Sequence, residues 1–178
     1  TGVLTLTSAG GTATNAQWAN ALSATTFSSS STTAGNRTVS FAVSDGTKTS
    51  AAATDVVAVS GPPTVTADSG SAAFVAGDNT PSTPVAIDMG ITVSDAGSAT
   101  LASATVAITG NFSSGQDVLS FTNTSSTTYG NISASYIAAV GVLTLTSSGA
   151  TATVAQWQSA LQAITYANTA VSPNTATR

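Results

Sequence analysis

The sequence contains no histidine, no cysteine and no glutamate, and only 6% of its 178 residues are charged. A Ser–His or Cys–His nucleophile, a pair of glutamates and a histidine metal site are therefore excluded. A Ser–Lys pair or a Lys–Asn isopeptide crosslink would depend on Lys48, the single lysine, which lies in the polar stretch 46–50 and is expected in a solvated turn. The composition predicts that the chain is not an enzyme.

Other absences narrow the class of protein further. Without cysteine, neither a disulfide nor a thiolate metal site can hold the chain together. No apolar run approaches the roughly 18 residues of a membrane span, and no signal peptide is recognisable. Three scattered cations, Arg37, Lys48 and Arg178, and a net charge of -4 provide no basic surface for nucleic acid. Because the chain starts at Thr1 rather than Met, we expect it to be part of a longer protein.

What the chain does contain is 42% hydrophobic residues, set among many Ser, Thr, Asn and Gly residues, a balance that suits β-sheets. Many short segments alternate apolar and polar residues, as half-buried strands do, and turn-rich stretches such as 45–46, 78–81 and 110–111 separate them. This pattern predicts an all-β sandwich. The alternating apolar positions are Val39, Phe41 and Val43; Val85, Ile87 and Met89; Ile91 and Val93; Ala104, Val106 and Ile108; Leu119 and Phe121; Ile132, Ala134 and Tyr136; and Leu143 and Leu145.

A long internal repeat organises the chain. Residues 2–29, GVLTLTSAGGTATNAQWANALSATTFSS, recur at 141–168 as GVLTLTSSGATATVAQWQSALQAITYAN, with 18 of 28 aligned positions identical. We call these the first block and the second block. Their offset of 139 residues is too long for a solenoid unit and indicates whole domains in tandem. Residues 1–61 are then the C-terminal part of one repeat and residues 62–178 the N-terminal part of the next, with the junction at Ser60-Gly61-Pro62-Pro63.

Each block also carries the pattern of one amphipathic helix, a capping box followed by a single apolar stripe. We expect each block to fold as strand, helix and strand. We also expect each tryptophan to seal its helix onto the sandwich rather than to stack on a ligand. The residues of the pattern are Thr153, Gln156, Trp157, Ala160, Leu161 and Ile164 in the second block, and Thr14, Gln17, Trp18, Ala21 and Leu22 in the first.

Several ordered motifs carry a resemblance to a known family. They are Val93-Ser94-Asp95, the sequence GQDVLSF at 115–121, GVLTL at 141–145, the stretch from Gln156-Trp157 to Tyr166-Ala167-Asn168, and RTVSF at 37–41 leading to Asp45-Gly46. With these motifs the sequence resembles the cadherin-like repeats of giant bacterial surface adhesins, which are similar to the repeats of chondroitin sulfate proteoglycan ectodomains. The resemblance implies an Ig-like or cadherin-like β-sandwich with one short α-helix per repeat. It also implies type I secretion, an extracellular location at the bacterial cell surface, and a part in cell adhesion or biofilm formation.

The resemblance also implies calcium as a cofactor. By resemblance and position, the candidate metal ligands are Asp45, Asp95 and Asp117, with Asn168 as a carbonyl donor. Calcium takes six to eight oxygen ligands from such residues at strand ends. The alternative is that each aspartate sits in a turn and hydrogen-bonds its own backbone.

Three functional hypotheses follow. In the first, each repeat is a structural extender whose partners are the neighbouring repeats of the same chain. In the second, the repeat itself binds a glycan through an exposed aromatic residue such as Tyr129 or Tyr136. In the third, incomplete sheets at the two ends of the chain are completed head to tail by another copy, which gives a surface filament.

Overall fold

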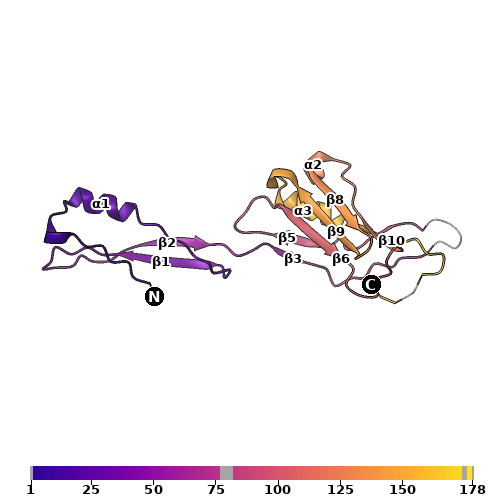
Figure 1. Cartoon of the computed structure of the whole chain (residues 1–178), viewed down its shortest axis with the longest axis horizontal. Coiled ribbons are helices and arrows are strands. Elements are labelled where there is room, and N and C mark those ends of the chain that lie inside the picture. Colours follow the sequence, from indigo (N-terminus) through magenta and orange to yellow (C-terminus); the bar gives the residue numbers. More distant parts are fainter. Residues whose placement is uncertain (1, 77–81, 174–175, 178) are drawn as a thin grey trace. The chain divides into compact units, whose positions relative to one another are not determined.

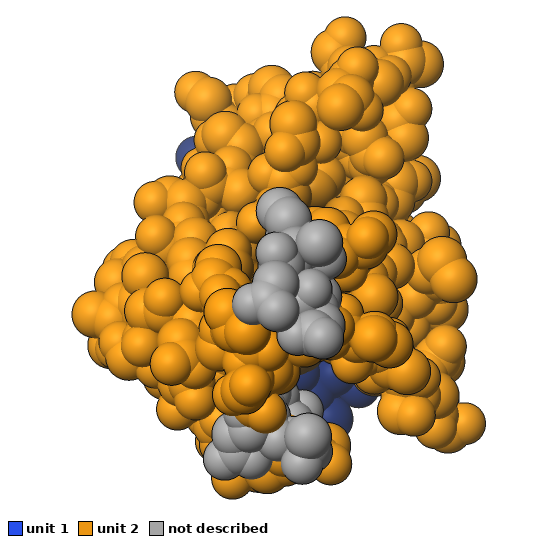
Figure 2. Space-filling view, turned by 90° about the vertical axis from the view of Figure 1, so that its right-hand side faces the viewer, with its two compact units in different colours: residues 1–59 blue, residues 60–178 orange. Residues whose placement is uncertain are grey.

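The computed structural model describes residues 2–76, 82–173 and 176–177; the predicted turn at 78–81 and Arg178 lie outside these ranges. The chain forms two compact units, Thr1–Val59 and Ser60–Arg178, which we call unit 1 and unit 2 (Figure 2). This division falls between Val59 and Ser60, whereas the sequence places it between Gly61 and Pro62. The chain is mainly β, with 30% strand and 17% helix, as predicted.

Unit 1 has little tertiary structure beyond one ribbon. The helix α1 (Asn15–Ser23) follows a 3₁₀ turn, η1 (Ala9–Gly11), and strands β1 (Gly35–Phe41) and β2 (Ala53–Val59) pair antiparallel from Gly35↔Val59 to Phe41↔Ala53 (Figure 1). Strand β1 contains Val39 and Phe41 of the predicted alternation but ends before Val43, and β2 was not predicted. None of the described residues of unit 1 is buried. Unit 1 therefore has no hydrophobic core of its own.

Unit 2 contains three small antiparallel sheets among its described residues, with strand orders β3-β5, β4-β10-β7 and β6-β9-β8 (Figure 1). The second block supplies the central strands β9 and β10 of the two larger sheets, and the helix between these strands. The elements are β3 (Thr64–Thr66), β4 (Val85–Ala86), β5 (Thr92–Ser94), β6 (Ser103–Ala107), β7 (Asp117–Ser120), α2 (Ser126–Tyr129), β8 (Ile132–Ile137), β9 (Val142–Ser147), η2 (Ser148–Ala150), α3 (Val154–Gln162) and β10 (Thr165–Asn168).

The predicted strand from Val85 to Met89 is wrong beyond Ala86, where β4 ends. Asp88 breaks the extended pattern, because one of its carboxylate oxygens accepts a hydrogen bond from the Gly90 N–H at 2.9 Å. Its other oxygen accepts one from the Asp68 N–H at 3.0 Å. The chain turns here, and the Met89 side chain is left 76% exposed.

The core of unit 2 forms where α3 packs against the sheets. Trp157 is 1% exposed, and its indole Nε1 donates a hydrogen bond to the Leu101 carbonyl at 2.9 Å. The prediction that this tryptophan is a core residue is confirmed. The other buried apolar residues come from β5, β7, β8, β9 and the second block: Val93, Leu119, Ile132, Leu143, Leu145, Ala152, Ala160, Leu161 and Ile164.

The two blocks share their local structure. In both, a threonine and a glutamine form a complete capping box at the start of the helix. In both, a glycine of the preceding 3₁₀ turn has a φ near +70°, which favours glycine: 70° at Gly10 and 69° at Gly149. The Ser8 hydroxyl accepts a hydrogen bond from the Ala13 N–H at 3.0 Å, and Ser147 and Ala152 repeat that bond at 3.0 Å. The repeated sequence thus fixes the same turn and helix twice.

The strands, however, form only in the second block. The expectation of a strand on each side of α1 is wrong, because residues 2–7 and 25–34 form no strand. In the second block, β9 lies between β6 and β8, and β10 lies between β4 and β7. These four partner strands lie within residues 85–137, which occur once in the chain. The first block has no such partners, so its backbone donors and acceptors have no ladder to join.

Candidate functional site

The three candidate aspartates lie in different places. Asp45 is exposed in the turn that follows β1 in unit 1, and its Oδ1 accepts hydrogen bonds from the N–H groups of Lys48 at 2.7 Å and Thr47 at 2.8 Å. These bonds, with Lys48 first, lower the pKa of the Asp45 carboxyl below its usual value of 3.8. Asp45 thus has the backbone-bonded turn geometry that the sequence left open as the alternative to metal binding.

Asp95 lies at the end of β5 in unit 2 and is half-buried. Its Oδ1 accepts a hydrogen bond from the Gly97 N–H at 2.7 Å, which is the same kind of aspartate turn. No other described residue donates a hydrogen bond to its carboxylate. Asp95 therefore keeps one carboxylate oxygen to which a cation could bind.

Asp117 and Asn168 are brought together by strand register. They are paired across β7 and β10, and both are buried, with 0% and 2% of their surface exposed. The Asn168 Nδ2 donates a hydrogen bond to Asp117 Oδ1 at 2.6 Å, and the Tyr166 hydroxyl donates to the same oxygen at 2.5 Å. Asp117 Oδ2 accepts from the Ser113 N–H at 2.7 Å. The carboxylate is thus buried among hydrogen-bond donors, which compensate its desolvation.

The polarity of this cluster favours a negative charge. The Ser113 N–H, the Tyr166 hydroxyl and the Asn168 amide present hydrogens rather than oxygen lone pairs to the Asp117 carboxylate. The Asn168 carbonyl oxygens are also engaged, because Oδ1 accepts from the Ala170 N–H at 2.8 Å and the backbone oxygen from the Ser82 hydroxyl at 3.0 Å. Both Asp117 carboxylate oxygens thus already accept hydrogen bonds. Among the described residues, no three acidic side chains are grouped so that they could hold a metal ion.

Tyr136 connects β8 to this cluster. Its hydroxyl donates a hydrogen bond to the Asp117 backbone oxygen at 2.7 Å. Desolvation, and next the negative charge of Asp117, raise the Tyr136 pKa above 10.0, and a backbone hydrogen bond with Leu119 opposes them in part. The folded state therefore holds the phenol proton more tightly than the unfolded state does.

A loss of stability at high pH is expected from this shift. The contribution of Tyr136 is fully present below pH 10, the value of the unfolded chain, and is lost as the pH rises through the higher pKa of the folded state. Urea unfolding of unit 2, followed between about pH 8 and pH 11, should show a falling midpoint above pH 10 that is shallower in Tyr136→Phe. Tyr129→Phe serves as control, because no described residue hydrogen-bonds that hydroxyl. An equal slope in both variants would contradict the assignment to Tyr136.

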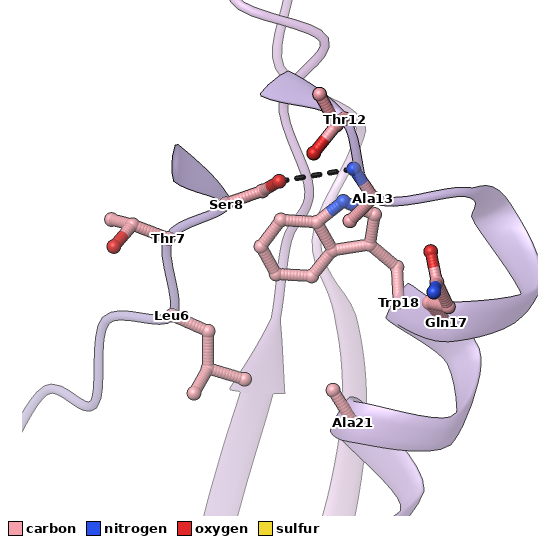
Figure 3. A pocket seen from close by; sticks show the side chains of 8 residues that line it. All are labelled: Leu6, Thr7, Ser8, Thr12, Ala13, Gln17, Trp18 and Ala21. Carbon is pink, nitrogen blue, oxygen red and sulfur yellow. Dashed lines mark hydrogen bonds between the residues drawn. The ribbon is translucent and has the colours of Figure 1, made fainter. Parts of the chain in front are cut away.

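Unit 1 contains an open hollow of about 480 Å³ beside α1. Figure 3 shows the Trp18 indole reaching from the helix toward Leu6 and Ser8. Trp18 is half-buried, whereas its counterpart Trp157 is almost fully enclosed. The expectation that both tryptophans seal their helices onto a sandwich is therefore wrong for Trp18. The residues that line the hollow are Leu6, Thr7, Ser8, Thr12, Ala13, Gln17, Trp18 and Ala21.

The aromatic residues proposed for glycan binding are engaged in packing. Tyr129 is half-buried, with its ring edge-on to Phe121 at a centroid distance of 5.3 Å, and Tyr136 is half-buried with its hydroxyl bonded. Among the aromatic residues that the structure describes, Phe27 alone is exposed, at 46%. Sequence reasoning did not single out Phe27, although its alignment with Tyr166 marks it as part of the repeat.

None of the helices in the described ranges has the length and apolar character that crossing a membrane requires. No family model, no curated protein and no solved structure matches this sequence.

Proposed function

We propose that the chain is part of a structural extender region of a bacterial cell-surface adhesin. In this proposal each period of 139 residues folds as an Ig-like or cadherin-like β-sandwich with one short helix, and successive periods add length between the cell and a distal binding domain. The location is extracellular, and the role is cell adhesion or biofilm formation. The partners of each repeat are its neighbours in the same chain.

One observation carries the proposal. The second block builds its core with the residues that precede it, whereas the first block repeats the same turn and helix without such a core. If each copy of the block needs a preceding segment to complete its core, segment and block alternate along the chain, which is the organisation of a tandem array. The half-buried positions of Tyr129 and Tyr136 favour the extender over the glycan-binding alternative, since neither ring forms an exposed platform.

Small-angle X-ray scattering can test the extender function. Polypeptides with one, two and three complete periods should differ in maximum dimension by a constant increment, because extended domains add length linearly. Their melting temperatures should be nearly independent of the number of periods, since each complete period is expected to have its own core. A maximum dimension that barely grows with the number of periods would contradict the proposal.

Calcium remains the proposed cofactor. Asp45 and Asp95 each keep one carboxylate oxygen to which no other described residue donates a hydrogen bond. The expected result is a melting temperature that rises with added calcium and falls again with EDTA, because a ligand that binds only the folded state stabilises it. Comparing Asp45→Asn with Asp95→Asn shows which aspartate carries the shift. Identical melting curves in calcium and in EDTA would remove calcium from the proposal.

A further inference from the structure

The first block presents an apolar face that is covered in the second block. Leu4 and Leu6 are 71% and 38% exposed, whereas their counterparts Leu143 and Leu145 are 2% and 0% exposed. Phe27 is also exposed, at 46%, whereas its counterpart Tyr166 is half-buried. The local fold beneath it is already formed, since the capping box and the serine-bonded turn are the same in both blocks. The turn and helix of the first block are therefore formed before any partner covers this face.

The second block shows what kind of partner fits. It is covered by residues 85–137, which we call the covering segment and which contains β4 to β8. The Leu101 N–H donates a hydrogen bond to the Ala152 oxygen at 3.1 Å, and the Leu101 oxygen accepts one from Trp157 Nε1 at 2.9 Å. The counterparts of Ala152 and Trp157 are Ala13 and Trp18, which line the open hollow (Figure 3).

The chain holds two blocks but a single covering segment. No described residue accepts a hydrogen bond from Trp18 Nε1, and residues 2–7 form no strand. The second block uses both edges of β9 and both edges of β10 for the strands of the covering segment. The corresponding residues of the first block form no strand, and their backbone donors and acceptors could pair with an added segment of this kind. The occupant that fits is thus another copy of this type of segment.

Two sequence differences between the blocks determine which type of covering segment fits the first block. Phe27 and Ser29 stand where Tyr166 and Asn168 donate hydrogen bonds to the buried Asp117. A phenylalanine has no hydroxyl to donate, and serine is shorter than asparagine. If the covering segment of this chain lay on the first block, its Asp117 would be buried without these two donors, which is unfavourable for a carboxylate.

We infer that the face of the first block is an interaction surface for a β-rich segment built like residues 85–137 but uncharged at the position of Asp117. This inference rests on the tandem organisation of the proposed function and adds a rule for which covering segment fits which block. Phe27 and Ser29 are the residues that set the rule.

A fusion protein tests the surface. Residues 60–140 are added directly before Gly2 of the full chain, so that Val140 meets a glycine as it does at Gly141. Hydrogen exchange of the two indole N–H groups is followed by NMR, with Trp157 as the internal control for a folded unit 2. In the unfused chain Trp18 should exchange fast and Trp157 slowly. With Asp117→Asn in the added copy only, exchange at Trp18 should slow by roughly tenfold or more.

Two further fusions test the selection rule. With Asp117 kept in the added copy, Trp18 should be protected severalfold less than with Asn at that position. Introducing Phe27→Tyr and Ser29→Asn into the first block should restore protection by the Asp117 copy, because both donors return. Equal protection by both added copies would overturn the rule, and rapid Trp18 exchange in all three fusions would overturn the surface.

The chain without an added copy tests whether the partner is a second copy of this chain. Protection of Trp18 that increases with protein concentration would show that a second copy of this chain occupies the face, which would overturn the inferred partner and favour the head-to-tail filament. The scattering experiment on complete periods does not depend on Trp18. A failure of the extender function and a failure of this inference are therefore distinguishable.

Discussion

Replacing Trp157 with alanine is expected to lower the free energy of unfolding of unit 2 by about 3–5 kcal/mol, whereas Trp18→Ala should cost unit 1 less than about 1 kcal/mol. The two tryptophans occupy the same position of the same capped helix, and each follows the sequence Ala-Gln. The expected difference therefore comes from tertiary packing alone. Trp157 is 1% exposed, so its replacement by alanine leaves a large cavity in the core and removes the hydrogen bond to the Leu101 carbonyl.

Urea unfolding of the full chain, followed through backbone amide resonances of each unit, measures both effects in one protein. The partner variants Trp157→Phe and Trp18→Phe separate volume from hydrogen bonding, since each keeps an aromatic ring and removes the indole N–H. Trp157→Phe should cost clearly less than Trp157→Ala, and Trp18→Phe should be close to neutral. Similar losses for Trp157→Ala and Trp18→Ala would show that the first block has a core that the structure does not contain.

The local structure of each block could be predicted from the sequence because its causes are local. The threonine and glutamine of the capping box are three residues apart, and both boxes form. The strands, in contrast, could not be predicted for both blocks from the repeated sequence. Residues 3–7 and 142–146 are identical in sequence, yet the second set alone is paired, because pairing depends on β6 and β8 and not on the segment itself.

The residues that form the candidate site could be predicted from the sequence better than the chemical role of those residues. Asp117 and Asn168 were both named from the sequence, and the structure pairs them although 51 residues separate them. The part played by Tyr166 and Ser113 was missed. The spacing of Tyr166 and Asn168 was the available signal, since residues two apart on a strand share a face, and both side chains donate to the same carboxylate oxygen. These donors stabilise Asp117 because its carboxylate is buried, and that burial arises only when the sheets of unit 2 assemble.

Replacing Asp117 with alanine should destabilise unit 2 by about 3–5 kcal/mol. The substitution removes the fully buried carboxylate that accepts hydrogen bonds from the Tyr166 hydroxyl, the Asn168 amide and the Ser113 N–H. Each buried donor that loses its partner costs about 1–3 kcal/mol. Asp95→Ala is the matched control in the same unit. Its carboxylate is half-buried and accepts one backbone bond, so a loss below about 1 kcal/mol is expected by urea unfolding.

The same variant distinguishes a structural carboxylate from a calcium ligand. Both Asp117 oxygens already accept hydrogen bonds, so the loss caused by Asp117→Ala should be equal in EDTA and in excess calcium. A double-mutant cycle with Asn168→Ala should give a coupling of about 1–3 kcal/mol in both buffers, because each substitution removes the partner of the other. If Asp117 instead binds calcium, its loss must grow with the calcium concentration, since the ion then stabilises only the chain that retains the carboxylate. A calcium-dependent loss would thus overturn the structural assignment.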